Sequence, residues 1–546
     1  PARPVGAGWA ERAHFAFGKG GPVSEVGTGA PLARSPGTYR SSVGTHVARL
    51  DAGEVEAYVS GLAQVPRARL ADFFGDLDES GLVLRLVYGL DADAVYKIVE
   101  WPVTGRSYRS VSEGQPAAFV EECEIFEQFG VRPDSPKLLN RLVVPPHAGR
   151  DFPRLGEPPP RELREPHAPH HVTGEAFEFP FGPVRAVAQE SLYMGLVTSG
   201  EEVIDLYLMA WHKHRAVERR LRGLALDKAL FLVERAEGLS AVANAWAFCR
   251  AAEAAQGLVV GEAAEVARAV ALELERIYNH AAAVAALCQA TGLSVGQAQA
   301  EMALERLLRV NLAAFGHRYL FGALAIGGTG RRLDADALSR ELPGAYGELR
   351  RVVEALFSTN SFMDRLEACG IVTREQAWRL GLVGPVARAS GCDLDTRRDH
   401  PFGVYTTTGV NVAQRDSGDV LARVQVMAAE AEESARLVRE LAGGLGRGGA
   451  VPLAVGSATD GADRAPGEAR VPSRAGSALG WCESPRGESL VWLSLDSDGR
   501  VRRARLRPGS ARNWRAFDDA ARSRNVFTDI PIIEASFWLT VAGFAR

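Results

Sequence analysis

The chain has 546 residues, which exceeds the size of one ordinary domain and allows a large buried core. Hydrophobic residues at 46% and charged residues at 24% match an average soluble globular protein, which excludes a disordered or a fibrous chain. The net charge of -4 is too small to indicate a nucleic-acid partner, and we expect none.

The N-terminal part of the chain predicts an arm followed by a small domain. Residues 1–45 are rich in Gly, Pro, Ser and Arg and show no sustained period, which predicts an extended arm. Between residues 46 and 148, the alternating runs LVLRLVYGL and VYKIVEW predict strands, and PAAFVEECEIFEQFG predicts an amphipathic helix. This segment therefore predicts a small α+β domain.

A proline-rich linker is predicted for residues 149–176. It contains His167, His170 and His171, which are residues of a type that binds metals. A proline-rich spacer holds no fixed ligand geometry, so chance spacing is the favoured interpretation of these histidines.

The remainder, residues 177–546, predicts a mainly α-helical bundle domain with small β-sheets. Helical period with few Gly or Pro residues occurs at 184–222, 226–256, 261–291, 295–323, 335–357 and 417–444. Long helices joined by short loops pack as a bundle. A Gly/Pro/Ala/Ser-rich segment at 443–477 predicts a surface loop, and SLVWLSLDSDGRVRRARLR predicts a β-hairpin with its turn at Asp498-Gly499. The expected fold class is thus α+β, with a small N-terminal α/β domain before the helical domain.

The six cysteines lie at positions 123, 249, 288, 369, 392 and 482 and form no Cys-x-x-Cys pair. This spacing argues against a disulfide framework, an iron-sulfur cluster and a structural zinc site. No apolar run reaches the ~18 uninterrupted residues of a membrane span, and the N-terminal PARPVGAGWAERAHFAF shows no secretory signal. We expect a soluble chain whose thiols are ordinary side chains.

Several motifs occur in an order that resembles a known family. WHKHRAVERRL contains His214, Arg215 and Glu218 at the spacing of a His-Arg-Gly-Ile-Glu motif, and FGPVRAV precedes it with Arg185 in place of a His. Further blocks are LVERAEGLSAVANAWAFCRAAE, GLVGPVARASGCDLDTRRDHPFGVY and CESPRGESLVWLSLDSDGRVRRARLRPGSARNWRAF. From about residue 182 onward the chain resembles the large subunit of nickel-iron hydrogenases and its relative, the large quinone-site subunit of respiratory complex I.

The first domain carries a second resemblance. GQPAAFVEECEIFEQFGVRPDSPKLLNRLVVPP resembles the small complex I subunit that pairs with the large one, with Glu122, Glu124, Phe129 and Gly130 at matching positions. A fusion of these two units is the arrangement of formate hydrogenlyase and hydrogenase-4 type large subunits. The two resemblances together imply a hydrogenase large-subunit-like fold for most of the chain.

The resemblance also implies a nickel-iron centre held by four thiolates from two Cys-x-x-Cys motifs. Here Glu237 and Ser240 stand in the first motif, and Thr540 and Gly543 stand in the second. A carboxylate and two hydroxyls are hard or neutral ligands, whereas such a metal pair needs soft sulfur. We therefore expect a degenerate site, with no metal and no cofactor bound by this chain itself.

Two roles stay open for Glu237: an ion pair with the nearby Arg235, or proton transfer by a buried carboxylate. The complex I relative holds a quinone headgroup in the emptied cavity with a His and a Tyr. Gly238 stands where that Tyr would be, which puts quinone binding in doubt, although Tyr193 is a candidate substitute. A cavity closed by side chains such as Phe537 and Trp538 would argue against a small-molecule acceptor.

The resemblance implies a peripheral subunit on the cytoplasmic side of a membrane, within a hetero-oligomeric oxidoreductase. Its partners would be a small subunit that carries iron-sulfur clusters, together with antiporter-like and anchor subunits in the membrane. Two mechanisms stay open: electron transfer to a quinone-like or other acceptor coupled to ion translocation, or a non-catalytic scaffold that couples conformations. In the second mechanism, the following polar residues are a leftover network: His214, Glu218, Arg235, Glu237, Arg388 and Asp395.

Two further features have ordinary interpretations. His280, at the end of LERIYNH, predicts a hydrogen-bonded core histidine, because it lies among apolar neighbours on a helix. The seven arginines between residues 500 and 515 predict one solvated or subunit-facing side of a strand.

Overall fold

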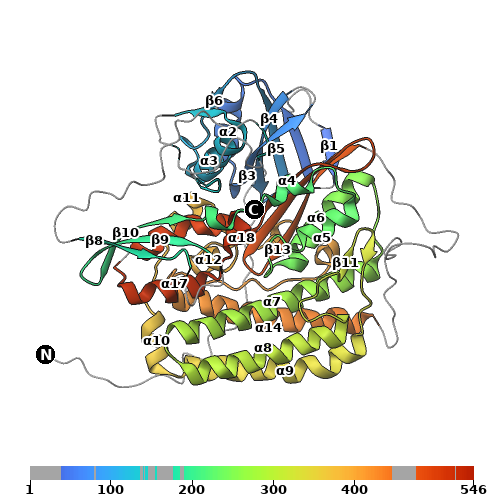
Figure 1. The fold of residues 1–546 in the computed structure, drawn as a ribbon. Coiled ribbons are helices and arrows are strands. Elements are labelled where there is room, and N and C mark those ends of the chain that lie inside the picture. Colours follow the sequence, from blue (N-terminus) through green and yellow to red (C-terminus); the bar gives the residue numbers. More distant parts are fainter. Residues whose placement is uncertain are drawn as a thin grey trace. The chain divides into compact units, whose positions relative to one another are not determined.

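The computed structural model (Figure 1) describes residues 39–42, 44–78, 81–135, 139, 142–145, 154–156, 176–184, 190–445, 475–522 and 524–546. Most of the predicted arm and linker, with His167, His170 and His171, lies outside these residues, as do Arg185 and most of the 443–477 segment. Within the described ranges, no helix combines the length and the apolar character needed to cross a membrane.

The N-terminal region forms a five-stranded sheet with the order β1-β2-β5-β4-β3. The strands are β1 (Tyr39–Ser42), β2 (Thr45–Arg49), β3 (Ala68–Asp78), β4 (Gly81–Leu90) and β5 (Val95–Val103). β2 pairs parallel with β5, and the other neighbours are antiparallel. The strands predicted in LVLRLVYGL and VYKIVEW are confirmed, and the first strand begins inside the predicted arm.

This sheet is buried on both faces. Leu84 and Leu86 of β4 pack with α2 (Val55–Ala63) and α3 (Phe119–Phe129), whereas Val87 points to the opposite layer, as the two-residue strand period requires. The helix predicted in PAAFVEECEIFEQFG is confirmed as α3. It is not simply amphipathic, because its carboxylates Glu121 and Glu122 are also buried.

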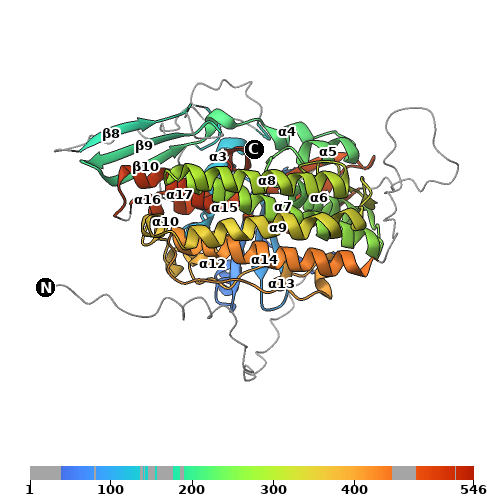
Figure 2. The same cartoon turned by 90° about the horizontal axis from the view of Figure 1, so that it is seen from below.

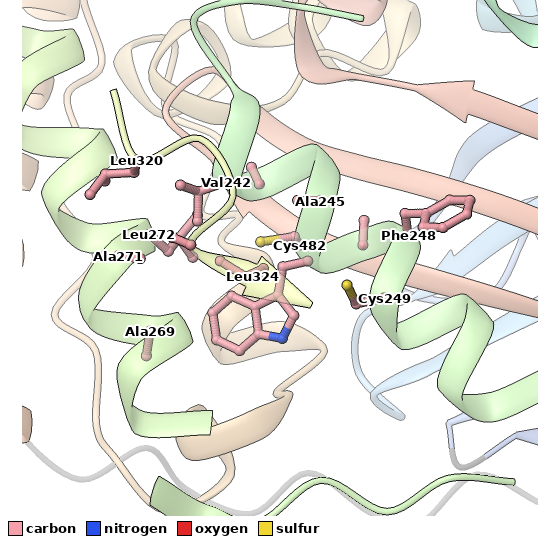
Figure 3. Close-up of a cluster of buried hydrophobic side chains, with 14 of the residues drawn as sticks. Val242, Ala245, Phe248, Cys249, Ala269, Ala271, Leu272, Leu320, Leu324 and Cys482 are labelled. Atoms are coloured by element: carbon pink, nitrogen blue, oxygen red, sulfur yellow. The ribbon is translucent and has the colours of Figure 1, made fainter. Parts of the chain in front are cut away.

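Four long helices form the bundle: α7 (Glu262–Ala290), α8 (Ser294–Phe315), α9 (Ala335–Phe357) and α14 (Val420–Gly444). Figure 2 shows them side by side, and all four lie in segments with predicted helical period. α7 also packs against α6 (Ala241–Gln256), and Figure 3 shows Phe248 of α6 and Leu272 of α7 in an apolar cluster with Cys249 and Cys482. All six cysteines are buried, and none of them forms a disulfide.

The helix predicted at 184–222 is wrong. The structure has a three-stranded antiparallel sheet there, with β8 (Phe177–Phe181), β9 (Tyr193–Ser199) and β10 (Glu202–Met209) in the order β10-β9-β8. Met194 and Leu196 lie in the core on one face of β9, and the turn uses Gly200 at φ 61°, a value that glycine adopts without steric cost. In the described part of the segment, the α-helix is the short α4 (Val217–Leu221) at its end, preceded by a 3-10 turn at Trp211–Lys213.

A second antiparallel sheet, β13-β14-β15, lies near the C-terminus. Its strands are β13 (Gly476–Ser484), β14 (Gly487–Leu495) and β15 (Val501–Arg507). The predicted hairpin is confirmed as β14–β15, but residues 496–500 join the strands, so the turn is longer than a two-residue one. β13 and β14 pack against α6, and β15 packs against β3, so this sheet lies between the bundle and the N-terminal sheet.

Shorter helices flank the loops that form the candidate site. They are α5 (Leu226–Val233), α10 (Asn360–Leu366), α11 (Arg374–Leu380), α12 (Gly384–Ala389), α13 (Thr396–Asp399), α15 (Gly509–Asn513), α16 (Phe517–Arg522), α17 (Ile530–Phe537) and α18 (Val541–Phe544). The helix predicted at 226–256 is divided into α5 and α6 by a loop at 234–240. That loop carries Glu237.

Candidate functional site

Two loops bring together the four positions at which the resemblance implies metal-binding thiolates. Glu237 is fully buried in the loop between α5 and α6, and its Oε1 accepts hydrogen bonds from Thr540 Oγ1 (2.5 Å) and Ser510 Oγ. Gly543 N donates to Thr540 Oγ1 (3.1 Å), and Ser240 N donates to the Glu237 carbonyl oxygen (3.1 Å). The four positions and Ser510, which sequence reasoning missed, form one buried polar group.

These residues do not fit a nickel-iron pair. Their donors are one carboxylate and hydroxyls, which are hard ligands, and none is a thiolate. A Cβ on Gly543 would lie 2.9 Å from Glu237 Oε1 and 2.8 Å from Thr540 Oγ1, so the side chains already fill the space that a cysteine would need. Among the described residues, no group of three or more His, Cys, Asp and Glu side chains is arranged to hold a metal ion.

Arg486 joins the two loops, and sequence reasoning missed this role. Its Nε donates to the Trp538 carbonyl oxygen (2.6 Å), and its Nη1 donates to the Leu239 carbonyl oxygen (3.2 Å) and to Ser240 Oγ (2.9 Å). Its Nη2 donates to Asn279 Oδ1 of α7 (2.9 Å). The Pro-Arg-Gly sequence between two buried strands could have indicated this role. A guanidinium buried at such a turn must find several hydrogen-bond acceptors.

Of the two roles left open for Glu237, the ion pair with Arg235 does not form in the structure. Arg235 points outward, with 38% of its side chain exposed, and its Nη1 contacts Glu234 Oε2 (3.2 Å). Its guanidinium carbon lies 3.6 Å from the centre of the Phe231 ring. The two residues point in opposite directions because Glu237 turns inward to the hydroxyl donors, while the charged Arg235 stays close to water.

An exposed aromatic surface lies beside this loop. Phe231 on α5 is 58% exposed, and Tyr319, two residues before the Phe321 ring that Arg235 contacts, is 42% exposed. Arg235 lies over Phe231 and also over the Phe321 ring (4.8 Å). Clustered exposed aromatic side chains with an arginine are typical of protein–protein interfaces.

A second carboxylate, Glu275 of α7, lies near Glu237 and Arg486. It is fully buried and accepts hydrogen bonds from the backbone N–H groups of Val242 (2.8 Å) and Ala243 (3.0 Å), at the start of α6. Burial raises the pKa of Glu275 to about 8, and the charge of Glu237 acts in the same direction. Glu275 therefore holds a proton at neutral pH, and sequence reasoning missed it.

Replacing Glu275 by glutamine is expected to remove part of the pH dependence of stability. Because its pKa is raised on folding, the stabilising contribution is present at low pH and is lost as the pH rises through about 8. We expect the unfolding free energy of the wild type to fall by on the order of 2–4 kcal/mol between about pH 5 and 9, and that of the variant to fall less. Urea denaturation across this pH range measures the difference. The same slope in both proteins would contradict the assignment, and Glu301→Gln on the exposed face of α8 is the control.

Glu218 and His214 belong to another cluster. Glu218 accepts hydrogen bonds from Arg503 Nη1 (2.7 Å), Arg546 Nε (3.0 Å) and the Leu506 backbone N–H (3.0 Å). Burial alone would raise the pKa of Glu218, but the arginines lower it to about 2. Burial lowers the pKa of His214. Glu218 is thus a permanently charged structural carboxylate.

Arg388 and Asp395 lie in a third buried cluster. Arg388 Nε donates to Glu430 Oε1 (2.9 Å) and its Nη1 to Glu483 Oε1 (3.0 Å), and Nη1 lies 3.4 Å from Asp395 Oδ2. The expected single leftover network of six polar residues is therefore wrong, because its members divide among three clusters and one exposed surface. The prediction for His280 is confirmed: it is buried and bonded through Nε2 to Glu430 Oε2 (3.0 Å).

The remaining candidates have local partners. Tyr193 donates to Glu178 Oε1 (3.1 Å) within the β8–β10 sheet. Phe537, the last residue of α17, is buried and packs edge-on against Phe517 of α16 (5.6 Å between ring centres), so its side chain belongs to the core. Trp538 contributes its backbone carbonyl to Arg486.

Comparisons with known proteins find relatives that match most of the chain. Residues 299–458 match the family described as respiratory-chain NADH dehydrogenase, 49 Kd subunit. The chain is 29% identical over 365 residues to the carbon monoxide-induced hydrogenase of Rhodospirillum rubrum, covering 65% of this chain and 96% of that protein. It is 28% identical over 457 residues to formate hydrogenlyase subunit 5 of Escherichia coli (strain K12), covering 80% and 77%. It is 27% identical over 356 residues to an NADH-quinone oxidoreductase subunit of Dehalococcoides mccartyi, covering 64% and 92%.

One solved structure with a similar fold is the membrane-bound sulfane sulfur reductase, an archaeal respiratory membrane complex. The TM-score is 0.60 at 20% identity, and the match covers 69% of this chain and 100% of that chain. At this identity the likeness shows the fold alone. The expected α+β fold class with a helical large-subunit-like domain is confirmed.

Proposed function

We infer that this chain, which belongs to the superfamily of the large subunits of hydrogenases and of NADH-quinone oxidoreductase, is the large subunit of a membrane-associated oxidoreductase complex. It is a peripheral subunit on the cytoplasmic side. Its proposed partners are a small subunit that carries iron-sulfur clusters, and antiporter-like and anchor subunits in the membrane. In this proposal residues 46–148 are a domain like the small complex I subunit, fused to the large-subunit-like residues 177–546.

The filled Glu237 site supports a coupling subunit rather than a nickel-iron enzyme. Glu237 is bonded to Ser510 and Thr540, and Arg486 ties the two loops that would have to open around a metal or a headgroup. A buried polar group bonded in this way is rigid and is costly to separate. The proposed role is therefore to connect the iron-sulfur subunit with the membrane subunits without a metal in this chain.

We place the iron-sulfur partner on the aromatic surface beside the loop that carries Glu237. Phe231, Tyr319 and Arg235 offer stacking and hydrogen-bonding groups next to the loop that carries Glu237. A partner seated there would cover Gly238, which is exposed and whose added Cβ would meet nothing within 4 Å. This open space is also the one observation that favours the alternative function, electron transfer to a quinone-like acceptor bound at the interface.

The test is isolation of the complex from native membranes through a tag on this chain. The proposal expects an iron-sulfur subunit and membrane subunits to copurify, and nickel to be far below one atom per chain by elemental analysis. One nickel per chain, or a chain recovered without partners, would overturn it.

The two mechanisms are separated by Gly238→Trp, which places a large ring at the open position. If a quinone-like acceptor binds there, reduction of a soluble quinone analogue by the reduced complex should be lost. If the chain is a coupling subunit, electron flow to that analogue should be the same in variant and wild type. Gly105→Trp is the matched control, because Gly105 is also exposed and its added Cβ meets only open space.

A further inference from the structure

The third buried cluster, that of Arg388 and Asp395, lies where α7, α12, α13, α14 and β13 meet, and the proposed function gives it no role. Each of its eight titratable side chains is at most 2% exposed. They are Glu273, Arg276, His280, Arg388, Asp395, Arg397, Glu430 and Glu483. We call this set the bundle-core cluster.

Arg388 is at the centre of the bundle-core cluster. Its Nε donates to Glu430 Oε1 (2.9 Å). The other oxygen of Glu430, Oε2, forms a hydrogen bond with His280 Nε2 (3.0 Å). Arg388 Nη1 faces Glu483 Oε1 at 3.0 Å and Asp395 Oδ2 at 3.4 Å. Two carboxylates, Glu483 and Asp395, therefore converge on one nitrogen atom.

The other two arginines pair with carboxylates other than that of Glu483, and Arg276 Nη1 also lies 3.9 Å from Glu430 Oε2. Arg397 bonds to Asp395 (2.7 Å, Nη2 to Oδ2) and to both oxygens of Glu273 (3.0 Å each). Arg276 bonds to Glu273 Oε2 (3.2 Å), while its Nη2 donates to the backbone carbonyl of Glu483 rather than to its carboxylate. Glu273 thus has two arginine partners, whereas the Glu483 carboxylate shares Arg388 with Asp395 and accepts one further hydrogen bond, from the Thr396 backbone N–H (3.1 Å to Oε2).

The charges in the bundle-core cluster do not balance. It contains four carboxylates and three guanidiniums, so that full ionisation with a neutral imidazole leaves one uncompensated negative charge. An uncompensated charge in a buried site is strongly unfavourable, and such a site takes up a proton instead. The cluster therefore needs one proton, and two of its groups are able to hold it: Glu483 and His280.

The surroundings of these two groups assign the proton to Glu483. The charged groups that face Glu483 are Arg388 from α12, Arg276 from α7, Asp395 at the N-cap of α13, and Arg397 within α13. Burial has the largest effect on the pKa of Glu483 and raises it, and the neighbouring Asp395 raises it further. His280 faces Glu430 from α14, but Arg276 and Arg388 also lie nearby. Burial and these two cations lower the pKa of His280, so its ring stays neutral.

We propose that the bundle-core cluster is a buried proton-binding site, in which Glu483 carries the proton at neutral pH. Release of this proton leaves two carboxylates, Glu483 and Asp395, sharing one nitrogen of Arg388. Because these groups come from α12, α13 and β13, with α7 and α14 on the other side, the proton controls how these five elements pack. The proposal does not depend on whether the chain reduces an acceptor.

The test compares two glutamine variants of the full-length chain in its purified complex. A neutral buried carboxyl gives an infrared carbonyl band that shifts on hydrogen–deuterium exchange. Glu483→Gln is expected to remove one such band, to leave the thermal midpoint close to the wild type, and to reduce the loss of stability with rising pH. The sign follows from the raised pKa: the protonated form stabilises the fold at low pH, and that stabilisation is lost as the pH rises.

Glu273→Gln is the matched control, because burial alone would raise the pKa of Glu273 but Arg397 and Arg276 lower it to about 2. This variant should keep the carbonyl band and should lower the thermal midpoint far more than Glu483→Gln. The proposal is overturned if the band stays at full intensity in Glu483→Gln. It is also overturned if Glu483→Gln lowers the midpoint as much as Glu273→Gln, because that would mean that Glu483 is ionised.

Discussion

Replacing Glu488 by alanine is expected to lower the unfolding free energy by about 3–5 kcal/mol, because it breaks a buried ion-pair cluster from one side. Glu488 on β14 is 1% exposed and accepts hydrogen bonds from both terminal nitrogens of Arg69 and from Arg507 Nη2. The hydroxyl of Tyr96 also donates to it (2.5 Å). Without the carboxylate, Arg507 loses its only ion-pair partner in the described part of the chain, and Arg69 keeps only Asp91.

Chemical denaturation of the isolated chain measures this loss. Glu440→Ala is the matched control, because Glu440 pairs with Arg436 at a distance of 2.5 Å but its side chain is 55% exposed. An exposed pair of this kind contributes at most about 1 kcal/mol. Equal losses in the two variants would show that the Glu488 cluster is solvated rather than buried.

This cluster also explains how the N-terminal sheet is joined to the rest of the chain. Arg69 and Tyr96 belong to that sheet, whereas Glu488 and Arg507 belong to β14 and β15. Arg505 makes a similar connection, with its Nη2 3.0 Å from Asp72 Oδ1 of β3. The boundary between the two parts is therefore built from buried ion pairs as well as from apolar contacts.

The sequence could not predict that boundary. Arginines at alternate positions of a strand look the same whether water or a carboxylate faces them, and a solvated or subunit-facing side was the expected outcome for residues 500–515. The structure shows Arg503, Arg505 and Arg507 to be at most 4% exposed. Asp72, the partner of Arg505, lies 433 residues earlier in the chain, and local pattern carries no information on such a pair.

Long helices and the meeting of the two loops could be predicted. Helical period over more than about 20 residues leaves few alternatives, and α7, α9 and α14 lie where the sequence places them. The order of motifs placed Glu237, Ser240, Thr540 and Gly543 in one site, and the structure brings these residues together. This prediction rested on the resemblance of the motif order to a known family, and not on the secondary-structure preferences of the residues themselves.

Short elements and side-chain directions could not be predicted. The segment 184–222 contains apolar residues that satisfy a helical period by chance, and only pairing of β9 with β8 and β10 selects the strands. Arg235 and Glu237 are close in sequence and opposite in charge, yet the backbone of their turn points them apart. Glu275 has no signal in the sequence that marks it as special, because its perturbation comes from burial at the start of α6.

The close fit of side chains around Glu237 is a physical reason why the residues at positions 237, 510, 540 and 543 must change together. Glu237 is longer than a cysteine, and its carboxylate reaches Thr540 and Ser510 only because Gly543 has no side chain. A cysteine restored at position 543 alone would therefore collide with Glu237 rather than recreate half of a metal site. Recovery of metal binding would require both loops to be changed at once.

Replacing Gly480 by alanine is expected to be among the most damaging single substitutions in the chain. Gly480 lies in the middle of β13, where a Cβ would be 1.9 Å from the Ala247 carbonyl oxygen and 2.7 Å from the Ala251 backbone nitrogen. Both atoms belong to the backbone of α6, so they cannot turn away as a flexible side chain does. The strand must move away from the helix, and overpacking of this kind costs about 3 kcal/mol or more.

Denaturant midpoints of Gly480→Ala and of a control, Gly344→Ala, test this expectation. Gly344 lies on the exposed side of α9 and its added Cβ would meet nothing within 4 Å, so alanine there should stabilise the helix by about 0.5–1 kcal/mol. The same substitution should thus have opposite signs at the two positions. A tolerated Gly480→Ala would mean that β13 does not lie against α6 as the structure has it. Displacement of β13 should also weaken the contacts made at the end of this strand. Glu483 reaches Arg388 from there, and Arg486, in the turn that follows, reaches Ser240 in the Glu237 loop.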